Sequence, residues 1–356
     1  MTKADDKTDG IIHENEYGDK KSHGFLRFLI FLVIAAFVAF FWNPILNFSA
    51  DYVGSLNYSP STVISELSNK LNLTPLGQAI LNGAKPQLDD SDSFNQHCNV
   101  EVSSISTIGC YTNRRIYIFN VTNNDLTGIK ESTLSHEFLH ATWAHLTFFE
   151  QYNLTTILQD AYNDEAYHTQ LAEDLETYDE SERLEEIYVR LGNEFQNLPP
   201  ELEAHYAQYF HDQDKIADFF DLYHEPFDAL EEEYHRLIAE INDLNKEIEA
   251  KNTDLSGAGD ALNNDIDAYN NCVEGRTNCG KSYSELAAEY DNLISRQNTF
   301  QSNLDELNAM IRKYNDLIET YNEKLTAYKS LWGDMNSNPL PEAPEIKSGS
   351  SKINQT

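Results

Sequence analysis

The feature that most constrains the fold is a pair of long heptad repeats in the C-terminal part of the chain. Apolar residues recur at alternating steps of four and three along residues 230–262 and again along 283–328. Each run keeps one face of a helix apolar over its whole length, so each predicts a long helix that needs a partner. A glycine-containing loop bounded by Cys272 and Cys279 separates the runs. Residues 227–332 are therefore predicted to form an antiparallel coiled-coil hairpin.

At 1.5 Å per residue, each arm of roughly 40 residues would extend about 60 Å. The simplest interpretation is that the two seams only pack on each other. The alternative is that the arm also mediates self-association or docks a partner, as coiled coils often do.

A second constraint is chemical, because His136-Glu137-x-x-His140 lies within an apolar helical pattern. Two histidines four residues apart lie one turn apart on one face of a helix, so both rings can reach one ion. Glu137 points around the helix and can accept a proton from a metal-bound water instead of binding the metal. The motif predicts a site for one zinc ion. The alternative is a buried helix whose histidines bond to neighbouring carbonyls.

Over residues 130–146 this motif resembles that of the zincin metallopeptidases. The metzincin branch needs a glycine three residues after the second histidine and a third histidine three residues further on. Trp143 stands at the glycine position and His145 falls one residue short. The resemblance therefore points to the gluzincin branch, in which the third ligand is a glutamate from a second, downstream helix.

Glu186 is the glutamate that best fits this gluzincin pattern, because Gly192 follows it on the same helix and a small residue permits close approach to the first helix. Glu194 is the alternative third ligand, and His205 is a further candidate. The acidic residue that the family usually has four positions after the ligand is absent, since Arg190 stands there.

The resemblance implies a zinc metallopeptidase that hydrolyses a peptide or protein substrate with a metal-activated water and Glu137 as general base. The competing class is a structural envelope or adhesion protein, built around the coiled coil, whose metal site is vestigial or only stabilising. A zinc hydrolase acting on a non-peptide envelope component would use the same ligands.

An uncharged, strongly apolar run that begins at Phe28 predicts a transmembrane helix over residues 25–48, since about 20 residues cross a bilayer. Basic residues lie just before it, and none follows until Lys70. By the positive-inside rule the N-terminus is cytoplasmic and the rest of this single-pass chain is extracellular at the cell membrane. A cleaved signal peptide is the alternative, but the run is longer than a typical signal core.

The four cysteines form two close pairs in the sequence, Cys98 with Cys110 and Cys272 with Cys279. Four cysteines allow three pairings, and proximity favours the local one. Disulfides would persist in the oxidising exterior that the topology predicts. A second metal site is less favoured, because neither pair has CxxC spacing.

With 25 basic and 59 acidic residues the chain carries a net charge of −34, which excludes nucleic acid as a partner. Two β-type segments, residues 100–106 and 115–121, precede the HExxH helix. The resemblance to zincins implies that 116–121 is an edge strand that pairs with substrate. The alternative is a sheet that only supports the helix. The predicted class is α+β, predominantly α. The predicted order is a disordered cytoplasmic tail (1–24), a transmembrane helix (25–48), a helical stalk (49–95), a zincin-like domain with a small sheet (96–226), the hairpin (227–332) and a disordered tail (333–356).

Overall fold

The computed structural model describes residues 27–35, 55, 57–98, 107–175 and 178–337. Within these ranges the chain is mostly helical with one three-stranded sheet, which confirms the predicted α+β, predominantly α class. None of the helices in the described ranges combines the length and apolar composition that a bilayer span requires. Of the predicted transmembrane segment 25–48, residues 27–35 are described and are helical; the remainder, and the predicted strand at 100–106, lie outside the described residues.

The sheet has the strand order β1-β3-β2, with β1 parallel and β2 antiparallel to β3. The strands are β1 (Gln87–Asp89), β2 (Gly109–Thr112) and β3 (Arg115–Phe119). The expectation that residues 116–121 form an edge strand is wrong, because β1 pairs with β3 on the side away from β2. A strand of three residues gives too short an alternation to be recognised in sequence. Among the described strands, β2 is the edge that lies against helix α5.

The segment expected to be a helical stalk does form helices, α2 (Thr62–Leu71) and α3 (Pro75–Gly83). Each starts with a hydroxyl cap, since the side chains of Ser61 and Thr74 accept a backbone N–H of the first turn. Their apolar side chains belong to the main core, so this segment packs on the domain instead of standing apart from it.

Helix α5 (Ile129–His145) is the centre of that core and is packed by α2, α3, the sheet, α8 and α10. Its Leu134, Phe138 and Leu139 have no exposed surface. The remaining described elements of the domain surround it: α4 (Ser91–Cys98), the short 3-10 helix η1 (Asn124–Leu126), α6 (Phe148–Tyr162), α7 (Glu165–Leu175), α8 (Arg183–Glu194) and α9 (Pro200–Tyr206).

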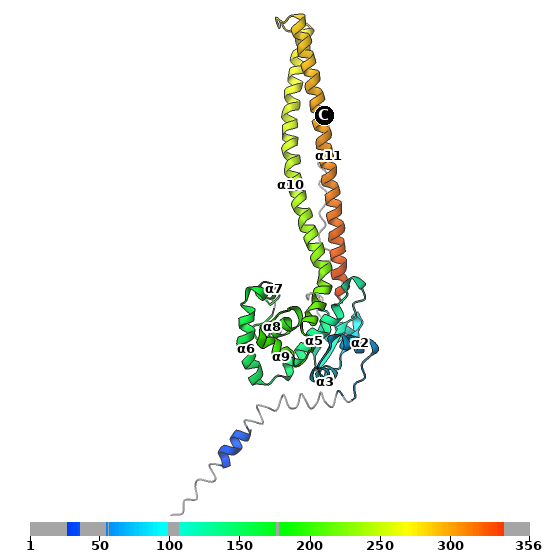
Figure 1. Cartoon of the computed structure of the whole chain (residues 1–356). Coiled ribbons are helices and arrows are strands. Elements are labelled where there is room, and N and C mark those ends of the chain that lie inside the picture. Colours follow the sequence, from blue (N-terminus) through cyan, green and yellow to red (C-terminus); the bar gives the residue numbers. More distant parts are fainter. Residues whose placement is uncertain (1–26, 36–54, 56, 99–106, 176–177, 338–356) are drawn as a thin grey trace, which may run out of the picture.

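The predicted hairpin consists of α10 (Asp214–Val273) and α11 (Tyr283–Met335), which run side by side away from the domain (Figure 1). Leu237 and Ile241 of α10 pack with Ile318 and Tyr321 of α11 along the seam. Helix α10 begins well before the predicted boundary at residue 227, because its first turns pack on the domain and not on the seam.

Disulfides join Cys98 to Cys110 and Cys272 to Cys279, as the local pairing predicts. The first connects the end of α4 to β2. The second closes the far tip of the hairpin (Figure 1). At the other end of the hairpin, the Ser91 hydroxyl of α4 donates a hydrogen bond to the Ser337 carbonyl, just after α11. This bond connects the end of the hairpin to the domain.

Candidate metal centre

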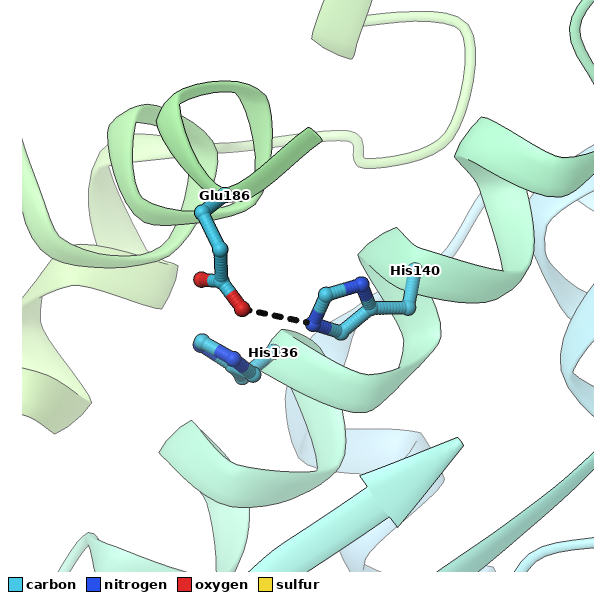
Figure 2. Close-up of side chains that lie close together, drawn as sticks. All are labelled: His136, His140 and Glu186. Carbon is cyan, nitrogen blue, oxygen red and sulfur yellow. Dashed lines mark ion pairs between the residues drawn. The ribbon is translucent and has the colours of Figure 1, made fainter. Parts of the chain in front are cut away.

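Three side chains from two helices converge at the face of α5 that carries the HExxH motif. His136 and His140 of α5 and Glu186 of α8 each offer one ligand atom, and these atoms all lie within 4.8 Å of one another. Figure 2 shows the two rings and the carboxylate facing a common point, with His140 Nε2 3.5 Å from Glu186 Oε1. Two imidazoles and a carboxylate are ligands that zinc and related divalent ions accept. The group can therefore hold a metal ion.

The other two candidates for the third ligand have different partners. Glu194 lies two turns further along α8, and its carboxylate Oε1 is 3.3 Å from an Arg190 guanidinium nitrogen. His205 lies on α9, where its Nε2 is 3.2 Å from the Tyr188 hydroxyl. Within the described residues, neither belongs to the group of ligand atoms around His136.

Close approach of α8 to α5 depends on Gly192. A Cβ atom added at this position would lie 2.7 Å from Cε1 of Tyr206 and 3.0 Å from Cδ1 of Leu139, a residue of α5. No side chain fits there without displacing packed neighbours. The small residue expected on the second helix is thus required by the packing that brings Glu186 to the histidines.

A buried polar cluster sets how the two helices lie relative to one another. Asn193 of α8 donates from Nδ2 to the Ser132 hydroxyl of α5 at 3.1 Å, and its Oδ1 accepts a hydrogen bond from the Ser135 hydroxyl. All three side chains are buried. Asn193 lies two helical turns from Glu186, so this contact fixes the same face of α8 that carries the ligand. This cluster was not predicted, although polar residues at otherwise buried helix positions were a signal for it.

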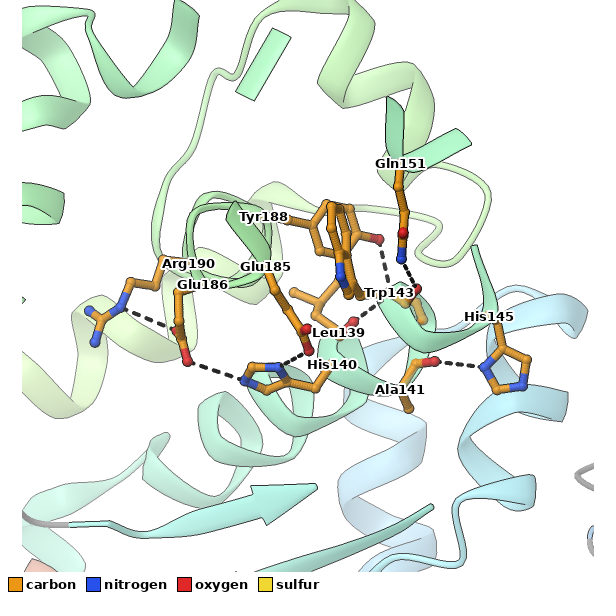
Figure 3. Close-up of polar contacts among 11 residues, drawn as sticks. Leu139, His140, Ala141, Trp143, His145, Gln151, Glu185, Glu186, Tyr188 and Arg190 are labelled. Atoms are coloured by element: carbon orange, nitrogen blue, oxygen red, sulfur yellow. Dashed lines mark hydrogen bonds and ion pairs between the residues drawn. The ribbon is translucent and has the colours of Figure 1, made fainter. Parts of the chain in front are cut away.

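Glu185 holds the ring of His140 on the side opposite Nε2, the nitrogen that faces Glu186. Its Oε1 lies 2.7 Å from Nδ1 of His140, so Nδ1 carries the hydrogen and Nε2 is directed at the ligand group (Figure 3). Arg190 contacts the other carboxylate oxygen of Glu186, with its Nε 3.7 Å from Oε2. The carboxylate that contacts His140 therefore precedes Glu186 on α8, whereas the gluzincin pattern that the motif resembles has its acidic residue at position 190. In so acidic a chain, Glu185 had no feature that distinguished it.

The four ionisable groups at the centre have strongly perturbed pKa values. Burial, together with the nearby charge of His140, lowers the pKa of His136 to about 3, so this ring is neutral and able to bind a metal. Burial disfavours the charged form of His140, but its hydrogen bonds to Glu185 and Glu186 prevail and raise its pKa. Burial likewise opposes ionisation of Glu186, yet the contact with His140 holds the pKa of this carboxyl below its usual range.

Glu137 lies beside His136, His140 and Glu186 and against β2. Its carboxylate accepts a hydrogen bond from the Tyr111 backbone, and a Cβ atom at Gly109 would lie 2.6 Å from its Oε1. A glycine at position 109 therefore makes the room for this carboxylate. Burial raises the pKa of Glu137 to about 7, which suits a group that exchanges protons near neutral pH.

Comparison with family models, curated proteins and solved structures finds no match to this chain. The resemblance to zincins therefore rests on the residues of α5 and α8 alone.

A cavity of about 590 Å³ opens onto the centre. His136, Glu137, His140 and Glu186 lie in its wall, together with residues 107–111, which lead into and form most of β2. The cavity also reaches α10 and α11 at the base of the hairpin. The hairpin was predicted to be a separate domain, and its contact with the cavity was not predicted, because heptad periodicity indicates only how the two arms pack on each other.

Proposed function

We propose that this chain is a zinc-dependent metallopeptidase whose catalytic centre is formed by α5 and α8. The observation that carries the proposal is the convergence of His136, His140 and Glu186 at a cavity, with Glu137 beside them. Structural zinc sites are normally closed by four protein ligands, whereas catalytic sites have three and leave one position open. Among the described residues, three ligands meet here, and the cavity gives access to them.

The residues present fit zinc. Both histidines can bind as neutral rings, since His136 already has a low pKa and the proton on His140 Nε2 is one that a cation can displace. When bound, the ion would polarise a water molecule and the carbonyl of the scissile bond.

Glu137 then performs the proton transfers. Its carboxylate accepts the proton of the attacking water and passes it to the departing amide nitrogen, so that the amine leaves neutral. The hydrogen bond from the Tyr111 backbone positions the carboxylate for these proton transfers, and the absence of a side chain at Gly109 leaves room for it. Glu185 keeps His140 oriented, while Arg190 balances the charge of Glu186. The contacts of Glu185 with His140 and of Arg190 with Glu186 fix the orientation of these ligands before substrate binds.

We also propose that residues 25–48 anchor the chain in the cell membrane and leave this domain outside. This part rests on the sequence, namely on the apolar run and on the basic residues that precede it. Resistance of the full-length chain to alkaline extraction from membranes, with loss of the domain when intact cells are treated with protease, would support it.

A structural role is the second candidate, and the length of the hairpin favours it. Helices α10 and α11 have 60 and 53 residues and extend away from the domain (Figure 1). The residues of the hairpin that line the cavity lie between 220 and 231 on α10 and between 328 and 335 on α11. In that case the metal would only stabilise the domain, and the arm would be the functional part.

Zinc content and peptide hydrolysis of the full-length protein distinguish the two. We expect one zinc ion per chain and cleavage of a mixed peptide library, read by mass spectrometry. Glu137→Gln should retain the zinc and lose activity by about 100-fold or more. The matched control is Glu203→Gln, an exposed position outside the cavity, which should change neither. Zinc binding without hydrolysis by the unmodified chain, or equal activity of the Glu137→Gln variant, would favour the structural role.

A further inference from the structure

The cavity continues from the metal centre to a wall of aromatic side chains at the base of the hairpin. These are Phe220, Tyr223 and Phe227 of α10 and Tyr328 and Trp332 of α11. Tyr223 and Phe227 are buried, whereas Phe220, Tyr328 and Trp332 are only partly buried. The wall therefore combines a packed base with rings that still present apolar surface to the cavity.

The rings hold one another in fixed positions. Phe227 packs edge-on against Tyr328 and Trp332, with ring centroids 5.7 Å apart in both pairs. Phe220 stacks on His224 at 4.2 Å. A pre-formed aromatic surface binds a further ring well, because offset and edge-on contacts add to the gain from burying apolar area. Little side-chain freedom remains to be lost on binding.

The charges along the same cavity are predominantly negative. Asp228 and Glu231 lie one turn apart on α10, next to the aromatic wall, and Glu185 and Glu194 of α8 also line the cavity. Arg190 is the only Lys or Arg among the described residues that line the cavity, and it is paired with carboxylates. Such a surface attracts a cationic ligand and repels an acidic one. A second copy of this chain, with a net charge of −34, is therefore a poor occupant.

We infer that this end of the cavity is a specificity subsite for a large aromatic side chain in a basic peptide segment. The aromatic side chain packs on Phe220 and Trp332, and a neighbouring Lys or Arg faces Asp228 and Glu231. This inference rests on the proposed function, since it places the substrate in the cavity that also holds Glu137. The base of the hairpin thus selects the substrate, while α5 and α8 cleave it.

The probe is an internally quenched peptide with one Phe beside two Lys residues in a Gly/Ala background. Two counterparts carry Ala in place of Phe, or Glu in place of both Lys. With the full-length zinc-loaded protein we expect kcat/KM to fall roughly 10- to 100-fold for each counterpart, as for loss of one large apolar or charged contact. Trp332→Ala and Phe220→Ala should each remove most of the preference for Phe. Tyr290→Ala changes an exposed ring of the same hairpin and should preserve it.

Binding gives a second readout that does not need turnover. The dissociation constants of the same peptides for the Glu137→Gln protein, measured by fluorescence anisotropy, should show the same order. Cleavage of all three peptides at equal rates would overturn the subsite and leave the proposed function standing. Selective binding of the Phe-Lys peptide without cleavage by the unmodified protein would support the subsite and overturn the peptidase proposal. Absence of both selective binding and cleavage would overturn both.

Discussion

Glu185 and His140 lie 2.7 Å apart, from the carboxylate Oε1 to the imidazole Nδ1, and this contact joins α8 to α5 on the side of the ring away from the ligand group. The carboxylate that contacts His140 Nδ1 thus comes immediately before Glu186, whose Oε1 lies 3.5 Å from His140 Nε2.

Glu185→Gln should therefore weaken zinc binding by about 10- to 100-fold without unfolding the domain, because loss of an orienting partner has that effect on a metal site. Competition with a chromophoric chelator measures the affinity. Glu182→Gln is the matched control, because Glu182 is exposed and outside the cavity. Equal affinities for the two variants would show that the contact does not orient the ring.

The third ligand is tested by comparing Glu186→Gln with Glu194→Gln. Removal of a direct ligand should cost more than removal of an orienting partner, so we expect Glu186→Gln to lower zinc affinity by more than about 100-fold. Glu194→Gln alters contacts with Arg190 and Gln170 and should keep one zinc ion per chain. Elemental analysis after dialysis measures the stoichiometry. Loss of zinc in the Glu194 variant alone would assign the ligand to that residue.

Gly192→Ala should destabilise the protein, because the added methyl group would meet Tyr206 and Leu139. Overpacking of this kind costs about 1–3 kcal/mol of unfolding free energy. Gly257→Ala is the control in an open part of α10, where nothing lies within 4 Å of an added Cβ atom. There the change should stabilise by about 0.5–1 kcal/mol, the usual gain of Ala over Gly within a helix. Chemical denaturation of both variants measures the unfolding free energy, which should fall for Gly192→Ala and rise for Gly257→Ala.

Asn193→Ala should destabilise the domain by about 1–3 kcal/mol, because it leaves the buried hydroxyls of Ser132 and Ser135 without their cross-helix partner. Ser135→Ala should cost less when Asn193 is already alanine, since the two residues share one contact. A double-mutant cycle from denaturation curves gives the coupling. Strict additivity would mean that the cluster does not link α5 to α8.

Local periodicity accounts for what the sequence by itself determined. His136 and His140 share a face because they are four residues apart in a helix, and this requires no knowledge of the rest of the fold. The seam of the hairpin follows from heptad spacing in the same way. The paired cysteines are separated by only 12 and 7 residues, so chain proximity predicts their partners.

Tertiary structure decided between the distant residues that the sequence left as alternatives, and it added others. The resemblance favoured Glu186 over Glu194 among 59 acidic residues, but only the packing of α8 on α5 shows that Glu186 reaches the histidines and that Glu194 pairs with Arg190. The same holds for Glu185 and for β1, whose partners are far along the chain. The aromatic wall of the cavity joins the start of α10 to the end of α11. These features depend on how the helices pack, and packing depends on the shapes of side chains throughout the core. The spacing of residues along a short segment contains no information about those shapes.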